Sequence, residues 1–314
     1  MRVQACLLNY RTSPLTLRAL DALLPEVRAM AGARICIVDN DSQDGSFEAL
    51  ATGVSERGAG DVVDVLQSGK NGGYGFGNNV ALRHALAAPS PPDYCWLVNS
   101  DAFVEPGALK TLVAYLDAHP DVGIASGYVH GTDGSPHSAA FTFPSVWSEI
   151  EGSARLGPIT RLLADYRVAR PVPARSTDDI DWVSGASMMI RSSVLERVGL
   201  FDETFFLYFE ETDLCRRARA AGFRVAFVRE ASVAHLHGAS TGVGNLARRT
   251  PGYLFDSRRY YFLKHHGRPY LWAANFARGL GLASFRVRRR LQGKADPDYQ
   301  RALVDFVAHC LKHP

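Results

Sequence analysis

Cysteine is scarce in this chain of 314 residues, and its placement excludes a disulfide framework. The number of cysteines is five, which is odd, and no two of them have the C-x-x-C spacing of a metal or redox motif. They are scattered along the whole chain: Cys6, Cys36, Cys95, Cys215 and Cys310. Isolated thiols in this pattern are typical of a protein in a reducing compartment.

Long apolar runs are also missing. No stretch approaches the roughly 18 uncharged apolar residues that indicate a membrane-spanning helix. The N-terminus enters the apolar residues 3–8 directly, without the basic region, the long apolar region and the cleavage site of a secretory signal. These two absences predict that the protein works in the cytoplasm.

An excess of charge of either sign is the third absence. The chain has 35 Lys and Arg against 32 Asp and Glu, a formal net charge of +3, which is too small to predict a nucleic-acid partner. With 46% hydrophobic and 21% charged residues, the composition is that of an ordinary globular protein. Disordered, collagen-like and coiled-coil classes are therefore excluded.

Apolar segments alternate with helical periodicity over the first hundred residues. The pattern predicts strands at residues 3–8, 34–39, 62–67 and 94–99, and helices at residues 13–30, 47–55 and 76–87. Short strands that alternate with helices indicate right-handed crossovers and a parallel sheet. The predicted fold class is α/β, with a mostly parallel, Rossmann-like central sheet flanked by helices.

Polar residues follow each of these four predicted strands. They are Asn9 and Tyr10, then residues 39–41, 68–71 and 99–101. Turn-forming residues are common at strand ends for conformational reasons alone. The carboxyl ends of parallel strands nevertheless share one edge of a sheet, where such folds bind ligands. We therefore expect the four ends to line one cleft.

The rest of the chain is less regular. Residues 127–175 contain several prolines and few clean periods, which predicts a loop-rich insertion with short helices. Strands are expected at residues 181–191, 223–228 and 231–235, and helices at 193–198 and 210–221. From residue 253 onward the sequence is helical and basic. The predicted organisation is one domain over residues 1–252, followed by a helical extension over residues 253–314.

Two segments of the first half carry the residue types of a nucleotide site. Residues 38–46 read V-D-N-D-S-Q-D-G-S, and a carboxylate such as Asp39 at the end of a buried strand can accept the imino N–H of uracil or thymine. The alternative is an Asx-rich turn in which Asp44 or Ser46 caps the next helix.

The second segment, residues 70–79, reads K-N-G-G-Y-G-F-G-N-N. Their glycines allow close approach to a ligand, and the helix that follows favours anions at its start.

An acidic segment follows a run of aromatic residues in the second half. Residues 199–217 read G-L-F-D-E-T-F-F-L-Y-F-E-E-T-D-L-C-R-R. Glu210 and Asp213 are one helical turn apart and share a face, whereas Glu211 points elsewhere. A carboxylate here could act as a general base. The alternative is that acidic residues favour the start of a helix through its dipole.

Together with residues 97–101 (L-V-N-S-D) and 233–240 (V-A-H-L-H-G-A-S), these segments resemble glycosyltransferase family 2, the inverting nucleotide-sugar enzymes of the GT-A fold. The likeness runs from Val3 to about Gly267, with the segments in the family's order. The family patterns are V-D-N-x-S-x-D-G-S, N-x-G-[FY]-[GA]-x-x-x-N, Asn-x-Asp or Asp-x-Asp, G-x-F-D-E-x-F-F-x-Y-x-E-D-x-D-L-x-x-R and H-x-x-G-x-S.

The resemblance implies a role for each segment. Glu211 takes the place of the second acid of the family's E-D pair, the catalytic base, with Glu210 as the competing candidate and Asp213 beside them. A divalent cation, Mg²⁺ or Mn²⁺, would be bound by Asp101 and His235, with His237 as the competing histidine. The expected nucleotide-sugar-binding residues are Asn9, Tyr10, Asp39, Asn40, Asn71, Gly72, Gly73, Asn79, Asn99 and Asp101.

The overall pattern is most similar to bacterial rhamnosyltransferases of cell-surface polysaccharide assembly. This resemblance implies transfer of L-rhamnose from dTDP-rhamnose to a hydroxyl of a glycan or lipid-linked oligosaccharide acceptor, with residues 127–175 on the acceptor side. A basic C-terminal helix with Trp272 and Phe276 on one face could contact the inner face of the membrane, or could simply be packed with a solvated end. Two alternatives stay open, a sugar-nucleotide nucleotidyltransferase and a non-catalytic sugar-nucleotide-binding protein.

Overall fold

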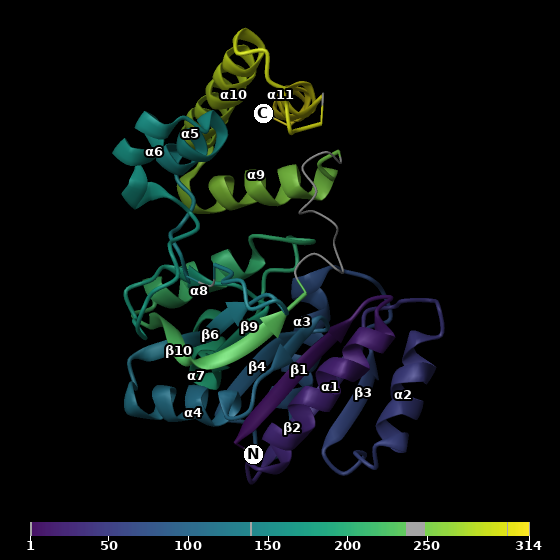
Figure 1. Cartoon of the computed structure of the whole chain (residues 1–314). Coiled ribbons are helices and arrows are strands. Elements are labelled where there is room, and N and C mark those ends of the chain that lie inside the picture. The colour runs from purple at the N-terminus through teal and green to yellow at the C-terminus, as the bar shows by residue number, and fades with distance from the viewer. Residues whose placement is uncertain (1, 139, 237–248, 300, 314) are drawn as a thin grey trace.

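The protein is described from a computed structural model, which covers residues 2–138, 140–236, 249–299 and 301–313. An α/β body forms the lower part of the molecule, and a lobe of helices lies above one edge of its sheet (Figure 1). Both halves of the chain contribute to each part.

The body is built on one eight-stranded sheet. In spatial order the strands are β3 (Val63–Gln67), β2 (Ala33–Asp39), β1 (Val3–Asn9), β4 (Tyr94–Asn99), β9 (Ser187–Arg191), β6 (Val122–His130), β10 (Arg224–His235) and β5 (Ala102–Val104). The pairs β3–β2, β2–β1, β1–β4 and β6–β10 are parallel, whereas β9 runs antiparallel to both β4 and β6. The predicted mostly parallel α/β sheet is confirmed.

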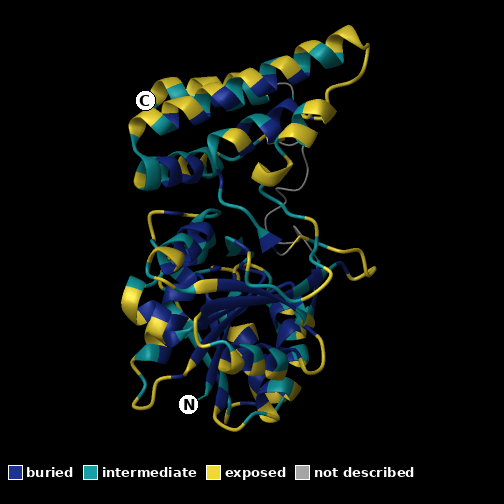
Figure 2. Cartoon of the chain, turned by 90° about the vertical axis from the view of Figure 1, so that its left-hand side faces the viewer, coloured by how far each residue is buried: buried dark blue, intermediate teal, exposed yellow. Residues whose placement is uncertain are grey.

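Helices cover both faces of the sheet, and each packs its apolar side against it. The helices are α1 (Ser13–Arg28), α2 (Ser46–Glu56) and α4 (Ala108–Ala118) on one face, and α3 (Tyr74–Leu86), α7 (Ser192–Val198) and α8 (Glu210–Ala220) on the other. Strand β1 sends Val3, Ala5 and Leu7 into the first core and Cys6 into the second. Burial on both faces explains why these strands read as continuous apolar runs, and Figure 2 shows the buried sheet between the partly exposed helices.

The lobe combines the C-terminal helices with a segment from the middle of the chain. Its helices are α5 (Val146–Ala154), α6 (Gly157–Leu162), α9 (Gly252–His266), α10 (Arg268–Leu291) and α11 (Ala302–Lys312), with a short 3₁₀ turn, η1 (Ala164–Tyr166). Helix α5 packs along α10, and the buried carboxylate of Glu149 accepts hydrogen bonds from Arg258 and Arg278. An ion pair buried in this way is broken only at high cost. The middle segment is thereby tied to the lobe.

Several elements differ from the sequence prediction. Strands β5 and β6 have no counterpart among the predicted elements, and β6 extends to His130, inside the residues expected to be loops. The strand expected at residues 181–191 is divided into β8 (Trp182–Val183), which pairs with β7 (Ala140–Phe141), and β9. The two strands expected at residues 223–235 are one strand, β10, with an irregularity in its pairing to β6. Among the described residues, no helix is long and apolar enough to cross a membrane.

Candidate active site

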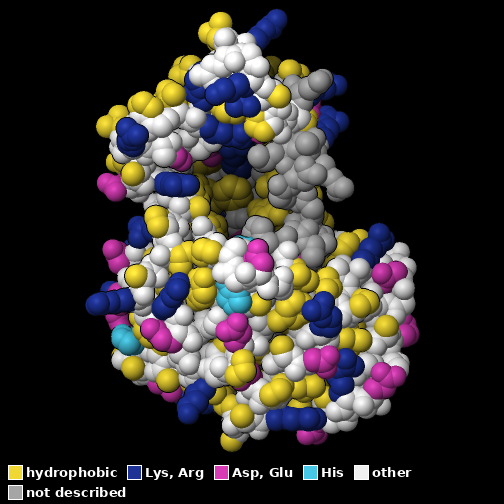
Figure 3. Space-filling model, viewed as in Figure 1, with side chains coloured by type: hydrophobic (Ala, Val, Ile, Leu, Met, Phe, Trp, Pro, Cys, Tyr) yellow, Lys and Arg dark blue, Asp and Glu magenta, His cyan; other side chains and the backbone are white. Residues whose placement is uncertain are grey.

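A cleft of about 680 Å³ lies at the carboxyl edge of the sheet, beneath the lobe. Figure 3 shows a hollow between the body and the lobe on this side of the molecule. Residues from all four predicted strand ends and the adjoining glycine-rich loop line the cleft, and Tyr253 and Leu254 of α9 contribute its lobe side. The cleft is therefore shared between the two parts of the chain.

Nine of the predicted site residues line this cleft. They are Tyr10, Asn40, Asn71, Gly73, Asn99, Asp101, Glu210, Glu211 and His235. Five others, Asn9, Asp39, Gly72, Asn79 and Asp213, are not part of its wall. His237 lies outside the described residues.

Asn9 and Asp39 hold a turn behind the cleft. Asp39 is 1% exposed, and its carboxylate accepts hydrogen bonds from the side chain of Asn9 at 2.7 Å and from the backbone N–H of Ser42 at 3.1 Å. The hydroxyl of Ser42 donates a further bond to the same carboxylate. Together these hydrogen bonds close a turn between residues 39 and 42. It fixes the backbone of the next residue, Asn40.

Asn40 is the residue of this turn that reaches the cleft. Its side-chain amide donates to Asn71 Oδ1 and to the carbonyl oxygen of Gly73, both at 3.1 Å. Its own Oδ1 is buried and has no hydrogen-bond partner. A buried acceptor without a donor is costly. A ligand N–H that reached this oxygen would remove that cost.

The glycine-rich loop is locked against the loop that precedes α8. Gly73 has a φ of +90°, and a Cβ at this position would overlap the carbonyl oxygen of Phe206. The N–H of Tyr74 donates to that same oxygen at 2.9 Å. Only glycine fits so close an approach. The loop of the first half and the acidic segment of the second half therefore form one continuous wall.

Asn79, predicted to bind the nucleotide sugar, joins α3 to the acidic segment. It is fully buried, accepts from the N–H of Phe201 at 3.0 Å, and donates to the carbonyl oxygen of Phe201 and to Glu203. These hydrogen bonds place the amide at the edge of the core, between α3 and the acidic segment. Asn79 positions the acidic segment from behind.

The acidic segment contains five carboxylates, and three of them are paired. Glu203 accepts from Asn79, and Asp202 accepts from Tyr260 at 2.9 Å and Lys264 at 2.8 Å. Asp213 is fully buried against the cations Arg217 and Lys264 and the ring of His265. These contacts hold the pKa of Asp213 below its ordinary value despite the opposing effect of burial. Asp213 therefore anchors α8 to α9.

Glu210 and Glu211 are the other two carboxylates, and both line the cleft. Each has one buried carboxylate oxygen, Oε2, without a hydrogen-bond partner. Burial raises the pKa of both groups, and the charge of Glu211 raises that of Glu210 further. The N–H of Gly185 partly offsets the rise in the pKa of Glu211. Of the pair, Glu211 is the more exposed.

The backbone before these two glutamates is strained. Tyr208 and Phe209 have φ values of 68° and 72°, in the left-handed region that large side chains rarely adopt. Such conformations cost about 1–3 kcal/mol each and persist where the surroundings enforce them, often at functional sites. Here they turn the chain so that α8 begins with Glu210 and Glu211 at the cleft.

Asp101 lies between β4 and β5, and His235 is the last residue of β10. Their side chains meet at the cleft. Asp101 Oδ1 lies 3.0 Å from His235 Nε2, and both side chains are buried and line the cleft. Two neighbouring ligands held at about 2.1 Å by an octahedral cation lie about 3 Å apart, so the pair fits a divalent metal. Asn99 and Ser100 line the same part of the wall.

Gly185 is a site residue that the sequence analysis did not predict. Tyr74 donates its hydroxyl to the carbonyl oxygen of Gly185 at 2.8 Å, and the N–H of Gly185 contacts the carboxylate of Glu211. The signal was present in the sequence, because residues 184–186 (S-G-A) interrupt an apolar run that was predicted as one strand. No comparable pattern in the sequence indicates that Phe206 and Leu207, or Tyr253 and Leu254 of α9, line the cleft.

We expect Glu210→Gln to raise the stability of the protein at neutral pH. Because the pKa of Glu210 is raised in the folded state from 4.5, the native protein loses stability as the pH rises above about 4.5 toward the raised value. Glutamine has no charge to bury, so the variant's advantage should be absent near pH 4 and should grow toward pH 8. Thermal unfolding of both proteins over this range tests the expectation. A variant that is less stable by the same margin at every pH would contradict it.

Comparisons with known proteins identify the family of the chain. Residues 3–250 match the family described as "Glycosyltransferase like family 2". The chain is 31% identical over 219 residues to N-acetylglucosaminyl-diphospho-decaprenol L-rhamnosyltransferase of Mycobacterium tuberculosis, a match that covers 66% of this chain and 68% of that protein. It is 28% identical over 161 residues to rhamnosyltransferase WbbL of Escherichia coli, covering 50% and 59%.

Solved structures show the same fold. The mannosyltransferase PcManGT from Pyrobaculum calidifontis, in complex with GDP-Man and Mn²⁺, is similar with a TM-score of 0.59 at 16% identity, covering 99% of this chain and 86% of that one. GalNAc-T7 with UDP, GalNAc and Mn²⁺ is similar with a TM-score of 0.62 at 13% identity, covering 100% and 58%. The protein is a transferase with a GT-A fold. It belongs to glycosyltransferase family 2, in which its curated relatives include rhamnosyltransferases.

Proposed function

We propose that the protein transfers L-rhamnose from dTDP-L-rhamnose to a hydroxyl group of a lipid-linked or glycan acceptor, with inversion at the anomeric carbon. The observation that carries the proposal is that the carboxylates of the acidic segment fall into two groups. Three of its carboxylates are paired, while Glu210 and Glu211 line the same cleft as Asp101 and His235. A cleft with one cation-binding end and one basic carboxylate suits transfer from a nucleoside diphosphate sugar.

The base of the nucleotide binds beside Asn40 and Tyr10. Asn40 Oδ1 has no protein donor and can accept the N3–H of thymine or uracil. Tyr10 lines the cleft and is 38% exposed, so its ring offers a surface for the base. Asp39 contributes through the turn that holds Asn40 in place.

Asp101 and His235 would hold a divalent cation together with the diphosphate of the donor. A hard cation such as Mg²⁺ uses one or two carboxylates and completes its coordination with substrate phosphates and water, so two protein ligands are sufficient. When bound, the ion neutralises charge on the leaving diphosphate as a Lewis acid. Asn99 and Ser100 lie next to this position and can donate or accept hydrogen bonds with the donor.

Glu211 removes the proton of the acceptor hydroxyl. As the acceptor oxygen forms its bond to the anomeric carbon, the bond from that carbon to the diphosphate oxygen breaks, and the proton passes to the carboxylate of Glu211. Burial and the charge of Glu211 raise the pKa of Glu210, which favours its protonated form and avoids a second negative charge beside the base. Gly185 and Tyr74 keep Glu211 in its position.

A ligand screen tests the identity of the sugar donor. The identity to two rhamnosyltransferases supports dTDP-L-rhamnose. In thermal-shift measurements with Mn²⁺, dTDP-L-rhamnose should raise the melting temperature more than UDP- or GDP-sugars do. An equal or larger shift with a GDP-sugar would contradict the donor while leaving the transferase itself intact.

We further propose that the lobe faces an anionic membrane that carries the acceptor, on the cytoplasmic side. Helix α10 has six arginines and no acidic residue. Its outer face carries large apolar side chains that are 50–83% exposed: Trp272, Phe276, Leu280, Val287 and Leu291. Arg268 and Arg290 are exposed at its two ends, and Figure 2 shows the exposed outer surface of the lobe. An apolar stripe with flanking cations suits the surface of a lipid bilayer.

Replacing two residues of this stripe is expected to weaken membrane binding. Phe276→Glu with Leu280→Glu removes apolar area and adds negative charge, so binding to vesicles with anionic phosphatidylglycerol should fall about tenfold or more. Leu162→Glu, on α6 and 82% exposed, is the control with the same type of change. Co-sedimentation measures the effect, and unchanged binding of the double variant would exclude the stripe as the contact.

A further inference from the structure

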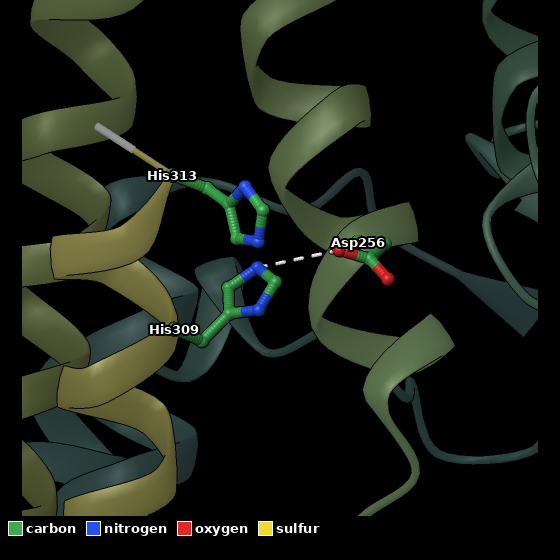
Figure 4. Close-up of side chains that lie close together, drawn as sticks. All are labelled: Asp256, His309 and His313. Atoms are coloured by element: carbon green, nitrogen blue, oxygen red, sulfur yellow. Dashed lines mark ion pairs between the residues drawn. The ribbon is translucent and has the colours of Figure 1, made fainter.

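A second group of possible metal ligands lies in the lobe, away from the cleft. Asp256 comes from α9, and His309 comes from α11, with His313 following its last turn (Figure 4). One ligand atom from each of the three residues lies within 4.8 Å of the other two. In the part of the chain that the structure describes, no other group of three such side chains comes this close.

The position of His309 gives the group an unsatisfied nitrogen. His309 Nε2 is buried, has no hydrogen-bond partner, and points toward Asp256 Oδ1 at 3.6 Å. The imidazole is 14% exposed and packs against the ring of Phe255. A buried ring nitrogen without a partner is costly. An ion between His309 and Asp256 would satisfy both atoms.

The chemical types of these three side chains indicate which metal ion would bind. Two imidazoles and one carboxylate form a typical zinc ligand set, and neighbouring ligands about 2.0–2.1 Å from a tetrahedral ion lie about 3.3 Å apart. The separation of 3.6 Å is close to this value. Mg²⁺ and Mn²⁺ prefer oxygen ligands, whereas two of the three ligands here are imidazoles, so this group suits Zn²⁺ better than either of those ions.

The attachment of α11 supplies a second, independent observation. Although α11 spans Ala302–Lys312, Phe306 is its one buried side chain. Short helices owe most of their stability to the apolar surface that they bury. Val304, Val307 and Leu311 are exposed, so packing alone holds this helix weakly. A metal bridge from α11 to α9 would add an attachment at its C-terminal end.

We propose that Asp256, His309 and His313 bind a Zn²⁺ ion that fastens α11 to α9, with water in the fourth position. The ion is structural and separate from the cation of the cleft. Its effect reaches the cleft through α9, because Leu254, two residues before Asp256, lines the cleft wall. The proposal does not depend on the donor or on the catalytic base.

Metal binding to the full chain tests this site directly. Tag-free protein, freed of metal by dialysis against chelator, is titrated with Zn²⁺ by calorimetry in the Asp101→Ala background, so that the cleft pair does not contribute. We expect one Zn²⁺ per chain at micromolar concentration, with a rise of several degrees in melting temperature, and no comparable rise with Mg²⁺. Co²⁺ in place of Zn²⁺ should give the visible absorption of a tetrahedral site.

Three variants separate this site from adventitious binding. His309→Gln and His313→Gln should each abolish the Zn²⁺ titration, the melting shift and the Co²⁺ absorption. His84→Gln, which alters a histidine of α3 beside Asp64, should leave all three unchanged. Zinc binding that survives both His309→Gln and His313→Gln would overturn the proposal, as would the absence of any binding by the parent protein.

Discussion

Glu211→Gln is expected to lower kcat by about 10²–10⁴-fold while the affinity for the donor nucleotide stays nearly unchanged. Glutamine keeps the size and the hydrogen bond to Gly185 but cannot take a proton from the acceptor. Because burial raises the pKa of Glu211 from 4.5, the acid limb of the kcat profile in the wild type should lie above the ordinary glutamate value. Steady-state kinetics and calorimetry with the donor nucleotide measure the two effects separately.

Two neighbouring variants are the controls for this expectation. Asp213→Asn should act mainly on stability, because Asp213 is buried against Arg217, Lys264 and His265. Glu210→Gln should lower kcat less than Glu211→Gln. If Glu210→Gln were inactive and Glu211→Gln retained full turnover, the base would be Glu210, one residue earlier.

Removal of divalent metal is expected to abolish turnover, and Mg²⁺ or Mn²⁺ should restore it. Asp101→Ala and His235→Ala should each lose most activity even at saturating metal, since each removes one of the two protein ligands that lie 3.0 Å apart. Activity measured in EDTA, and again after addition of each metal, tests the role of the ion. Full turnover in chelator would contradict the assignment of both residues.

His309→Gln is the matched control for these two variants, because it alters a potential metal ligand outside the cleft. Its activity should still depend on added Mg²⁺ or Mn²⁺ in the same way as the wild type. A loss of the metal response in this variant would mean that the lobe site, and not Asp101 and His235, supplies the activating ion.

The predictable part of the fold follows from local patterns. Strands β1 to β4 are apolar runs bounded by polar turns, and their spacing with α1 to α3 indicates a parallel sheet. The antiparallel strand β9 could not be predicted as such, because its direction is set by pairing with β4 and β6, far away in the chain. The place of α5 depends on its packing against α10, more than a hundred residues later.

The difference between local patterns and long-range contacts also explains which parts of the site could be predicted. Strand ends that share an edge brought Asn40, Asn99 and Asp101 together as predicted by the topology. Whether a polar side chain faces the cleft or the interior depends on partners that the sequence does not reveal. Asn79 is held by Phe201, 122 residues away, and Asp213 by His265, 52 residues away. A motif thus indicates a site's location more reliably than it separates residues that touch a ligand from those that support them.

The configuration of the bond that the enzyme forms is the most direct test of the proposed reaction. A single displacement in which Glu211 deprotonates the acceptor must invert the anomeric carbon of the donor sugar. NMR of the product from dTDP-L-rhamnose and a lipid-linked acceptor should therefore show an anomeric configuration opposite to that of the donor. A product with the donor's configuration would contradict the account, because it would require a different mechanism from the one that the cleft is proposed to support.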